Sequence, residues 1–240
     1  MSAVAPNPVR VEGRLDPRLS RGLWLVKWLL AIPHFIVIVF LFLAFLLLTI
    51  VAFFAILFTK RYPRSLFDFN LGVLRWGWRV GFYTYDALGT DRYPPFSLGP
   101  ERDYPASLEV EYPGELSRGL VLVKWWLLAI PHYLVLGVFM GGGWFTWQGG
   151  WDDDGRGWSG GPGLIGLLVL FAAIALLFTT RYPRGIFDLV IGLNRWVFRV
   201  IAYAALMTDV YPPFRLDQGG AEPGPADVSG GDESAAATPA

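Results

Sequence analysis

The chain has 240 residues, of which 54% are hydrophobic and 17% are charged, and its formal net charge is zero. The apolar share excludes an ordinary soluble domain, which would expose too much apolar surface to water, and the neutral balance disfavours a nucleic-acid partner. The absence of cysteine excludes disulfides, thiolate nucleophiles and cysteine metal sites.

The N-terminal part predicts a short disordered segment followed by a strand. We expect residues 1–8 to be disordered, and residues 9–12 are the first of four short β-rich pieces beside proline or glycine. No small-residue cleavage site follows the first apolar stretch, so we expect an uncleaved chain anchored by its own helices. A small cytoplasmic sheet is predicted from residues 9–12, 96–98, 106–111 and 214–216.

An internal repeat dominates the chain. LSRGLWLVKWLLAIPH at residues 19–34 recurs at 116–132 as LSRGLVLVKWWLLAIPH, with one additional tryptophan. FTKRYPRSLFD at 58–68 recurs as FTTRYPRGIFD at 178–188, and each copy closes with YPPF. The sequence therefore predicts two tandem membrane repeats, 9–98 and 99–216, followed by a disordered tail, 217–240.

The second copy contains an insertion. His34 and His132 are 98 residues apart, whereas Arg61 and Arg181 are 120 apart, so the second copy has gained 22 residues. The gain falls at 141–162, whose glycines, aspartates and arginine require water rather than hydrocarbon.

This insertion predicts a hairpin in each copy. Residues 28–59 carry no Lys, Arg, Asp or Glu, and as one helix they would measure ~48 Å at ~1.5 Å per residue, more than a ~30 Å hydrocarbon core. If the polar loop marks the far membrane surface, the first copy should turn near Phe42 and Leu43. The predicted hairpins pair residues 22–42 with 44–59 and residues 119–140 with 163–179, with kinks at Pro33 and Pro131.

The distribution of basic residues predicts the orientation. Under this arrangement only Arg156 of the 20 Lys and Arg residues lies on the inserted loop. The positive-inside rule then places both termini in the cytoplasm, for a multi-pass protein of the plasma membrane.

A third helix is expected after each hairpin, at 66–88 and 186–207. Each carries a polar stripe at helical spacing among aromatic residues. We expect these helices to lie in the inner interface, with Trp76, Trp78 and Trp196 at headgroup depth. The fold class is thus an all-α integral membrane protein with two repeats, each a transmembrane hairpin plus an amphipathic interfacial helix, and short cytoplasmic strands.

The stripe arginines have two interpretations. They could line a polar seam between third helices that face each other, neutralised by Asp68 and Asp188, or they could lie independently at the interface. The four arginines are Arg75, Arg79, Arg195 and Arg199.

The RYPR motifs and the histidines also have a functional and a structural interpretation. Paired arginines suit lipid phosphates, but they also anchor a helix and pair with the following aspartate. A histidine inside a membrane segment suggests a titratable function, or it bonds a backbone carbonyl opened by the proline. The residues concerned are Arg61, Arg64, Arg181 and Arg184 in the motifs, and His34 and His132 in the helices.

The blocks LLAIPH, ILFT-x-RYPR-x-x-FD, LRW-x-x-RV and TDRYPPF together resemble the bacterial membrane family known as domain of unknown function 4389. The resemblance covers about residues 9–216, although Val210 stands where the first copy has Arg92. It implies a membrane location and fold, and no activity or functional residue.

The functional expectation follows from these features. The sequence has no nucleophile, metal cluster or carboxylate pair at useful spacing, so neither an enzyme nor a metal or cofactor site is expected. We expect a protein that organises membrane lipids or a partner at the inner leaflet, with a protein partner or homo-oligomer left open. The alternative is a transporter or permeation pathway between the repeats.

Overall fold

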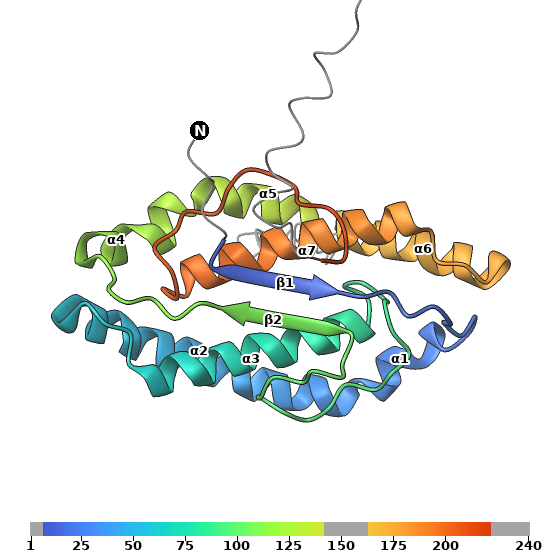
Figure 1. Ribbon diagram of the computed structural model, residues 1–240, viewed down its shortest axis with the longest axis horizontal. Helices are drawn as coiled ribbons and strands as arrows, with labels where there is room; N and C mark the ends of the chain where they lie inside the picture. The colour runs from blue at the N-terminus through green and yellow to red at the C-terminus, as the bar shows by residue number, and fades with distance from the viewer. Residues whose placement is uncertain (1–6, 142–162, 222–240) are drawn as a thin grey trace, which may run out of the picture.

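A computed structural model describes residues 7–141 and 163–221 of the chain as one layered body of helices around a two-stranded sheet (Figure 1). The first copy contains β1 (Val9–Gly13), α1 (Trp24–Leu30), α2 (Ile32–Thr59) and α3 (Arg64–Tyr83). The second contains β2 (Ala106–Val110), α4 (Arg118–Val123), a π-helical turn η1 (Lys124–Leu128), α5 (Ile130–Met140), α6 (Leu164–Thr179) and α7 (Arg184–Ala204). The described residues leave out 1–6 of the predicted disordered N-terminus (1–8), 142–162 of the inserted loop and 222–240 of the predicted tail.

The two strands tie the copies together. β1 and β2 pair antiparallel, with Val11 opposite Leu108 at the centre. β1 belongs to the first copy but packs on α7 of the second copy. β2 belongs to the second copy but packs on α3 of the first copy. The predicted strands at 9–12 and 106–111 are confirmed, whereas residues 96–98 and 214–216 are not strands.

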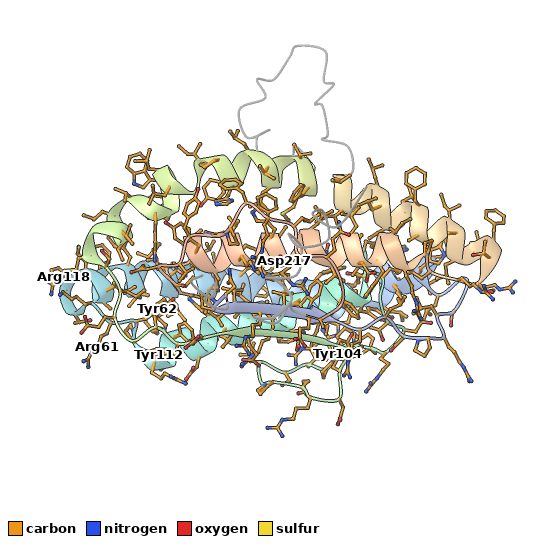
Figure 2. All side chains as sticks on the ribbon, turned by 45° about the horizontal axis from the view of Figure 1, so that its top comes forward. Arg61, Tyr62, Tyr104, Tyr112, Arg118 and Asp217 are labelled. Carbon is orange, nitrogen blue, oxygen red and sulfur yellow. The ribbon has the colours of Figure 1, made fainter. Side chains whose placement is uncertain are left out.

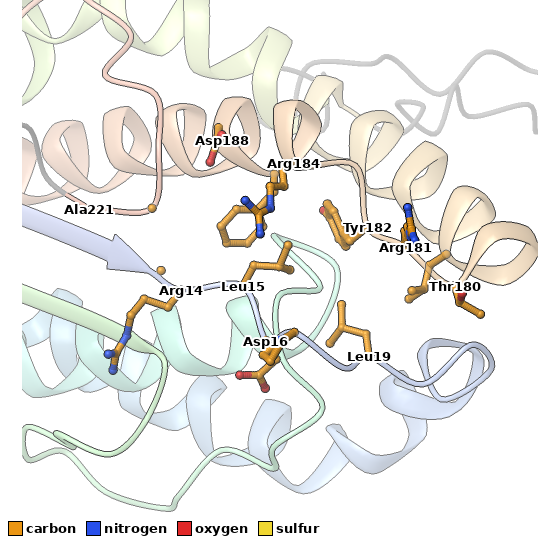
Figure 3. Close-up of a pocket in the computed structure, with 15 residues that line it drawn as sticks. Arg14, Leu15, Asp16, Leu19, Thr180, Arg181, Tyr182, Arg184, Asp188 and Ala221 are labelled. Atoms are coloured by element: carbon orange, nitrogen blue, oxygen red, sulfur yellow. The ribbon is translucent and has the colours of Figure 1, made fainter.

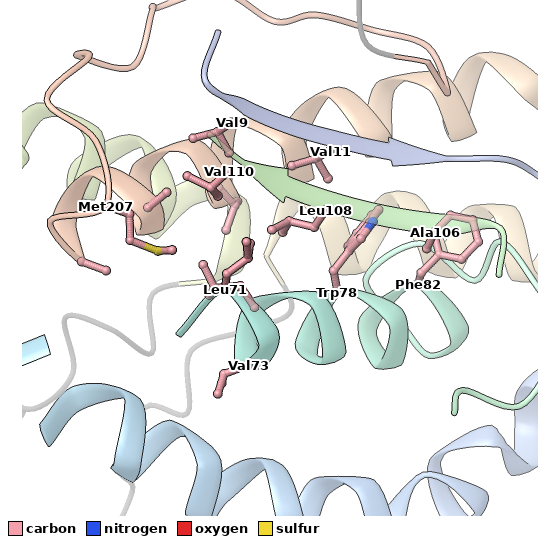
Figure 4. Close-up of a cluster of buried hydrophobic side chains, with 14 of the residues drawn as sticks. Val9, Val11, Leu71, Val73, Trp78, Phe82, Ala106, Leu108, Val110 and Met207 are labelled. Carbon is pink, nitrogen blue, oxygen red and sulfur yellow. The ribbon is translucent and has the colours of Figure 1, made fainter. Parts of the chain in front are cut away.

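The sheet has one buried and one exposed face. Its alternating apolar residues are buried over α3, where they meet Trp78 and Phe82 (Figure 4). The opposite face carries Arg10, Glu12 and Glu109, which are exposed. The strands therefore form the polar outer layer of the molecule.

The predicted third helices exist but are not interfacial. α3 packs between β2 and α2, and Trp76 and Trp78 are buried in the core. α7 takes the corresponding place under β1 and beside α6. The two helices do face each other, but through aromatic rings, such as Trp78 against Phe198 at 5.4 Å between ring centroids. Burial on several sides makes them core helices, because loops and strands cover the stripe that sequence periodicity assigned to water.

The predicted hairpin in the first copy is wrong. α2 continues through Phe42 and Leu43 as one helix of 28 residues. No glycine or proline follows Pro33 in this helix, so the sequence near Phe42 and Leu43 offers no residue that favours a turn.

The second copy follows the same course with an interruption. α5 has 11 residues and α6 has 16, and Gly163 lies so close to Gly141 that an added Cβ would come within 2.1 Å of the Gly141 nitrogen. Figures 1 and 2 show α6 continuing onward from α5 rather than running back beside it. α5 and α6 therefore follow one line, and the chain does not turn back between them as the hairpin prediction required.

The additional tryptophan of the second copy is absorbed in the η1 turn. A π-helical turn holds one more residue than the α-helical turn it replaces, so the helix can keep its later residues in register. Trp125 and Trp126 are both about half exposed, while Lys124 and His132 are buried like their counterparts Lys27 and His34.

Proline lies near the start of α2 and of α5. Pro33 and Pro131 are in the first turns of these helices, where the missing N–H has no partner to lose. The second copy bends by 44° between Arg118–Leu128 and α5. The kink predicted at Pro131 is thus present, between two helices rather than inside one.

The remaining faces of α1, α2, η1, α5 and α6 form an exposed apolar layer. Phe40, Phe58, Phe171 and Phe178 are 68%, 72%, 63% and 79% exposed. Within the described residues, α2 alone is long and apolar enough to cross a membrane, and the bent pair Arg118–Leu128 with Ile130–Met140 would add a second span if counted as one.

Candidate functional site

The four stripe arginines do not form the predicted seam. Arg75 donates to the Leu108 carbonyl at 3.1 Å and pairs with Glu109, and Arg79 donates to the carbonyls of Ser97 and Gly99. None of these partners is the predicted Asp68 or Asp188, which lie beside the RYPR motifs. The predicted neutralisation was wrong because a guanidinium has five donors, and the following loops supply carbonyls closer to hand.

The second copy repeats this arrangement with one carboxylate added. Arg195 donates to the carbonyls of Val11, Asp217 and Gly219, and Arg199 pairs with Asp217 at 2.7 Å. Arg75 and Arg195 thus each bind a carbonyl of one of the two paired central strand residues, Leu108 and Val11. These arginines hold strands and loops on the core and are not available to a ligand.

Asp217 extends the ordered chain beyond the predicted boundary at residue 216. Burial would raise the pKa of its carboxyl, but the hydrogen bonds and positive charges of Arg199 and Arg215 outweigh burial and lower it. Gly220 also accepts a hydrogen bond from the Gly13 N–H at 2.9 Å. Residues 217–221 therefore belong to the folded body.

The RYPR arginines are exposed at opposite ends of the molecule. Arg61 and Arg64 lie at the end of α2 and the start of α3, and Arg64 pairs with Asp68 at 3.3 Å. At the same end Arg118 of the second copy donates to the Phe58 carbonyl at 2.8 Å (Figure 2). Each basic end therefore combines residues of both copies.

The opposite end is hollowed. A cavity of about 750 Å³ lies between the segment after β1 and the start of α7, and Arg181, Arg184 and Asp188 are among its lining residues (Figure 3). Of the candidate residues, Arg181, Arg184 and Asp188 are thus brought together at this cavity.

The histidines occupy equivalent aromatic pockets. Trp76 Nε1 donates to His34 Nδ1 at 3.0 Å, and Trp196 Nε1 donates to His132 Nδ1 at 3.1 Å. Each ring also stacks on the phenylalanine of YPPF, at 3.9 Å for Phe96 and 4.3 Å for Phe214. The predicted backbone carbonyl is therefore not the Nδ1 partner, because the tryptophan from the adjacent core helix reaches that nitrogen first.

The tryptophan contact indicates the tautomer of each histidine. An Nδ1 that accepts from tryptophan leaves Nε2 as the protonated nitrogen of a neutral ring. Both Nε2 atoms are buried and have no hydrogen-bond partner among the described residues. No group of three or more metal-ligating side chains occurs in that part of the chain.

Sequence analysis missed a pair of buried lysines. Lys27 bonds the Thr90 carbonyl at 2.6 Å and pairs with Asp91 at 2.9 Å, and Lys124 does the same with Thr208 and Asp209, at 3.0 and 2.7 Å. Both partners could have been noticed in the sequence, since VKW and TD recur in both copies. Their pairing could not, because each lysine and its aspartate are more than 60 positions apart.

One family model matches the chain. It is described as Domain of unknown function (DUF4389), and it matches residues 21–97 and 163–215. The two segments correspond to the two repeats, the second beginning where α6 begins. No curated protein and no solved structure matches the chain.

Proposed function

The chain belongs to the DUF4389 family, in two tandem copies, and from this premise we propose that it is a non-enzymatic protein that binds phospholipid headgroups and organises lipid or a partner at the inner leaflet of the plasma membrane. The observation that carries the proposal is the separation of the surface into an exposed apolar layer and exposed arginines at its two ends. Arginine binds phosphate with two parallel hydrogen bonds, and apolar helices beside it suit acyl chains.

We further propose that the long helices lie within the inner leaflet. Figure 1 looks down the shortest axis of the molecule and shows α2, α5 and α6 stretched across the view, roughly parallel to the strands. An upright α2 would therefore carry the exposed Arg10, Glu12 and Glu109 into the hydrocarbon, where a central charge costs about 3 kcal/mol or more. In the flat orientation these charges face the cytoplasm together with both termini.

We favour lipid binding over the transport alternative, because the stripe arginines that suggested a polar seam bind carbonyls and carboxylates within the protein.

Vesicle binding tests the lipid proposal. The purified protein should float with vesicles containing phosphatidylglycerol more than with vesicles of phosphatidylcholine alone, and the preference should weaken when Arg61, Arg64, Arg181 and Arg184 are all changed to Ala. The variant Arg10→Ala, on the sheet face, controls for the loss of a single exposed arginine and should be compared with each of the four single Arg→Ala changes. Equal flotation of wild type and quadruple variant with both vesicle types would refute headgroup binding.

A further inference from the structure

The two ends of the molecule are built from equivalent segments of the two copies, which differ at several positions. Alignment of the copies places Leu15 after β1 where Tyr112 follows β2. Each of these residues faces the start of a core helix: Tyr112 faces α3, and Leu15 lines the cavity at α7.

Beside α3 of the first copy, Tyr112 closes this position. Its ring lies under the Arg64 guanidinium at 4.5 Å and meets the Phe67 ring edge-on at 5.0 Å. Its hydroxyl donates to the Tyr62 carbonyl at 2.5 Å. Arg64 is thus held by an aromatic ring and by Asp68.

Beside α7 of the second copy, where Leu15 takes the place of the tyrosine, the position is open. Leu15 has neither the ring nor the hydroxyl, and the cavity of about 750 Å³ lies where the tyrosine would be. Figure 3 shows Arg184 and Leu15 facing each other across this space, with Arg181 toward the end of α6. With leucine in place of tyrosine, Arg184 lacks the ring that covers Arg64 in the first copy.

The lining of the cavity suits an anion with an apolar tail. Its charged residues are three arginines and two aspartates, an excess of one positive charge, and the carboxylate of Asp16 accepts a hydrogen bond from the Thr90 hydroxyl. Its apolar residues include Leu19 and Leu176, and α6 continues from Leu176 to the exposed Phe178. The three arginines are Arg14, Arg181 and Arg184, and the second aspartate is Asp188.

We propose that this cavity is a binding site for one singly charged phospholipid, whose phosphate lies on Arg181 and Arg184 and whose acyl chain follows α6. The inference rests on the proposed function, which concerns both basic ends, and it adds that only the second copy holds a lipid in a defined site. A single excess positive charge matches a phosphodiester with an uncharged headgroup, such as phosphatidylglycerol.

The test compares matched variants of the two copies. Leu15→Tyr should close the cavity as Tyr112 closes its counterpart, and Arg181→Ala with Arg184→Ala should remove the phosphate ligands. Native mass spectrometry of the protein in detergent with added dihexanoyl phosphatidylglycerol would measure binding. Both variants should weaken the affinity for one lipid about tenfold or more. For the arginine pair, this magnitude follows because a charge-assisted hydrogen bond contributes about 1.5 to 3 kcal/mol. Arg61→Ala with Arg64→Ala is the comparison at the other basic end and should weaken this affinity less. Arg10→Ala, on the exposed sheet face, is the control and should leave it unchanged.

The remaining outcomes separate the two proposals. Equal losses in the two arginine pairs, with no effect of Leu15→Tyr, would overturn the defined site and leave general headgroup binding intact. No saturable binding to any variant, together with failed vesicle flotation, would overturn both. Competition by inorganic phosphate as strong as by the lipid would show that a soluble phosphate compound is the ligand and would overturn the assignment to lipid.

Discussion

At the scale of single residues, the buried lysines show how the repeat stabilises itself. Each lysine near the start of a copy reaches the aspartate near its end, and the same aspartate accepts the backbone N–H of the serine in LSRG, at 2.5 Å for Asp91 and 2.6 Å for Asp209. Lys27 is 1% exposed and Asp91 21%. One carboxylate therefore closes each copy by joining the segment before its first helix to the loop after its core helix.

Removal of this carboxylate should be costly. Asp91→Asn leaves the Lys27 ammonium buried without a counter-charge, and loss of one partner of a buried pair typically costs about 3 kcal/mol or more. Asp68→Asn is the control, because Asp68 and Arg64 are 54% and 66% exposed and such pairs contribute less than about 1 kcal/mol. Thermal unfolding of the protein in detergent would compare them. Similar small losses in both variants would contradict a stabilising role of the buried pair.

Asp217 predicts an acid limb of the stability curve. Its folded-state pKa is lower than the ordinary carboxyl value of about 3.9, so its contribution is complete above that pH and is lost as the pH falls through the folded-state pKa. Asp217→Asn should lower stability near pH 7 and flatten the decrease below about pH 4. Melting temperatures from pH 3 to 7 would show this, and parallel curves for wild type and variant would contradict it.

At the scale of elements, the α5–α6 line explains how a polar insertion is tolerated. The ends of the insertion, Gly141 and Gly163, lie together, so the insertion adds residues without separating the helices that contact the core. α6 packs on α7 with the same face that α2 presents to α3 in the first copy. The position of α6 thus depends on its phase relative to α5 rather than on the inserted residues.

Deletion of residues 141–162 should therefore preserve the fold. It joins Met140 to Gly163 and restores the 28-residue length of α2, so circular dichroism should retain its helical signal and the melting temperature should change little. Deletion of residues 140–162 is the control. It removes one residue more and rotates α6 by about 100°, which turns its buried face away from α7. Equal stability of the two deletions would show that α6 does not depend on this phase.

At the scale of the whole molecule, the two copies share their structure through exchange of strands. The strand before each copy packs on the core helix of the other, so neither copy has a complete core by itself. The resulting body has a charged strand layer, a core of α3 and α7, and an apolar outer layer. This one-sided distribution is the reason for proposing a flat orientation in the membrane.

Depth measurements along α2 distinguish flat from upright orientations. The chain has no cysteine, so single nitroxide labels can replace Ile36, Leu43 and Ile50, which are 57%, 57% and 56% exposed. A flat helix should give three similar depths from oxygen and nickel accessibility, whereas an upright helix would spread them over about 21 Å. A label at Ser107, on the exposed sheet face, should be accessible to nickel. A steady gradient in depth from residue 36 to residue 50 would refute the flat orientation.

Some properties of this protein follow from its sequence alone. The repeat, the position of the 22-residue insertion, the strands near 9–12 and 106–111 and the existence of the helices near 66–88 and 186–207 could be derived from local composition and self-similarity, and the motifs indicated the family. These features depend on neighbouring residues, and hydrophobic periodicity and turn residues report them directly. The candidate RYPR arginines also remained exposed, because prolines and charges at a helix boundary keep such side chains at the surface.

Only the tertiary structure decided how these parts fit together. An apolar run of this length is equally compatible with one helix and with a hairpin, and a polar stripe does not show whether water, a carboxylate or a loop carbonyl will satisfy it. The continuity of α2, the carbonyl partners of Arg79 and Arg195 and the pairing of Lys27 with Asp91 depend on contacts between distant segments. The open cavity beside Leu15 likewise depends on which strand packs on which copy, a choice made by the burial of the whole core.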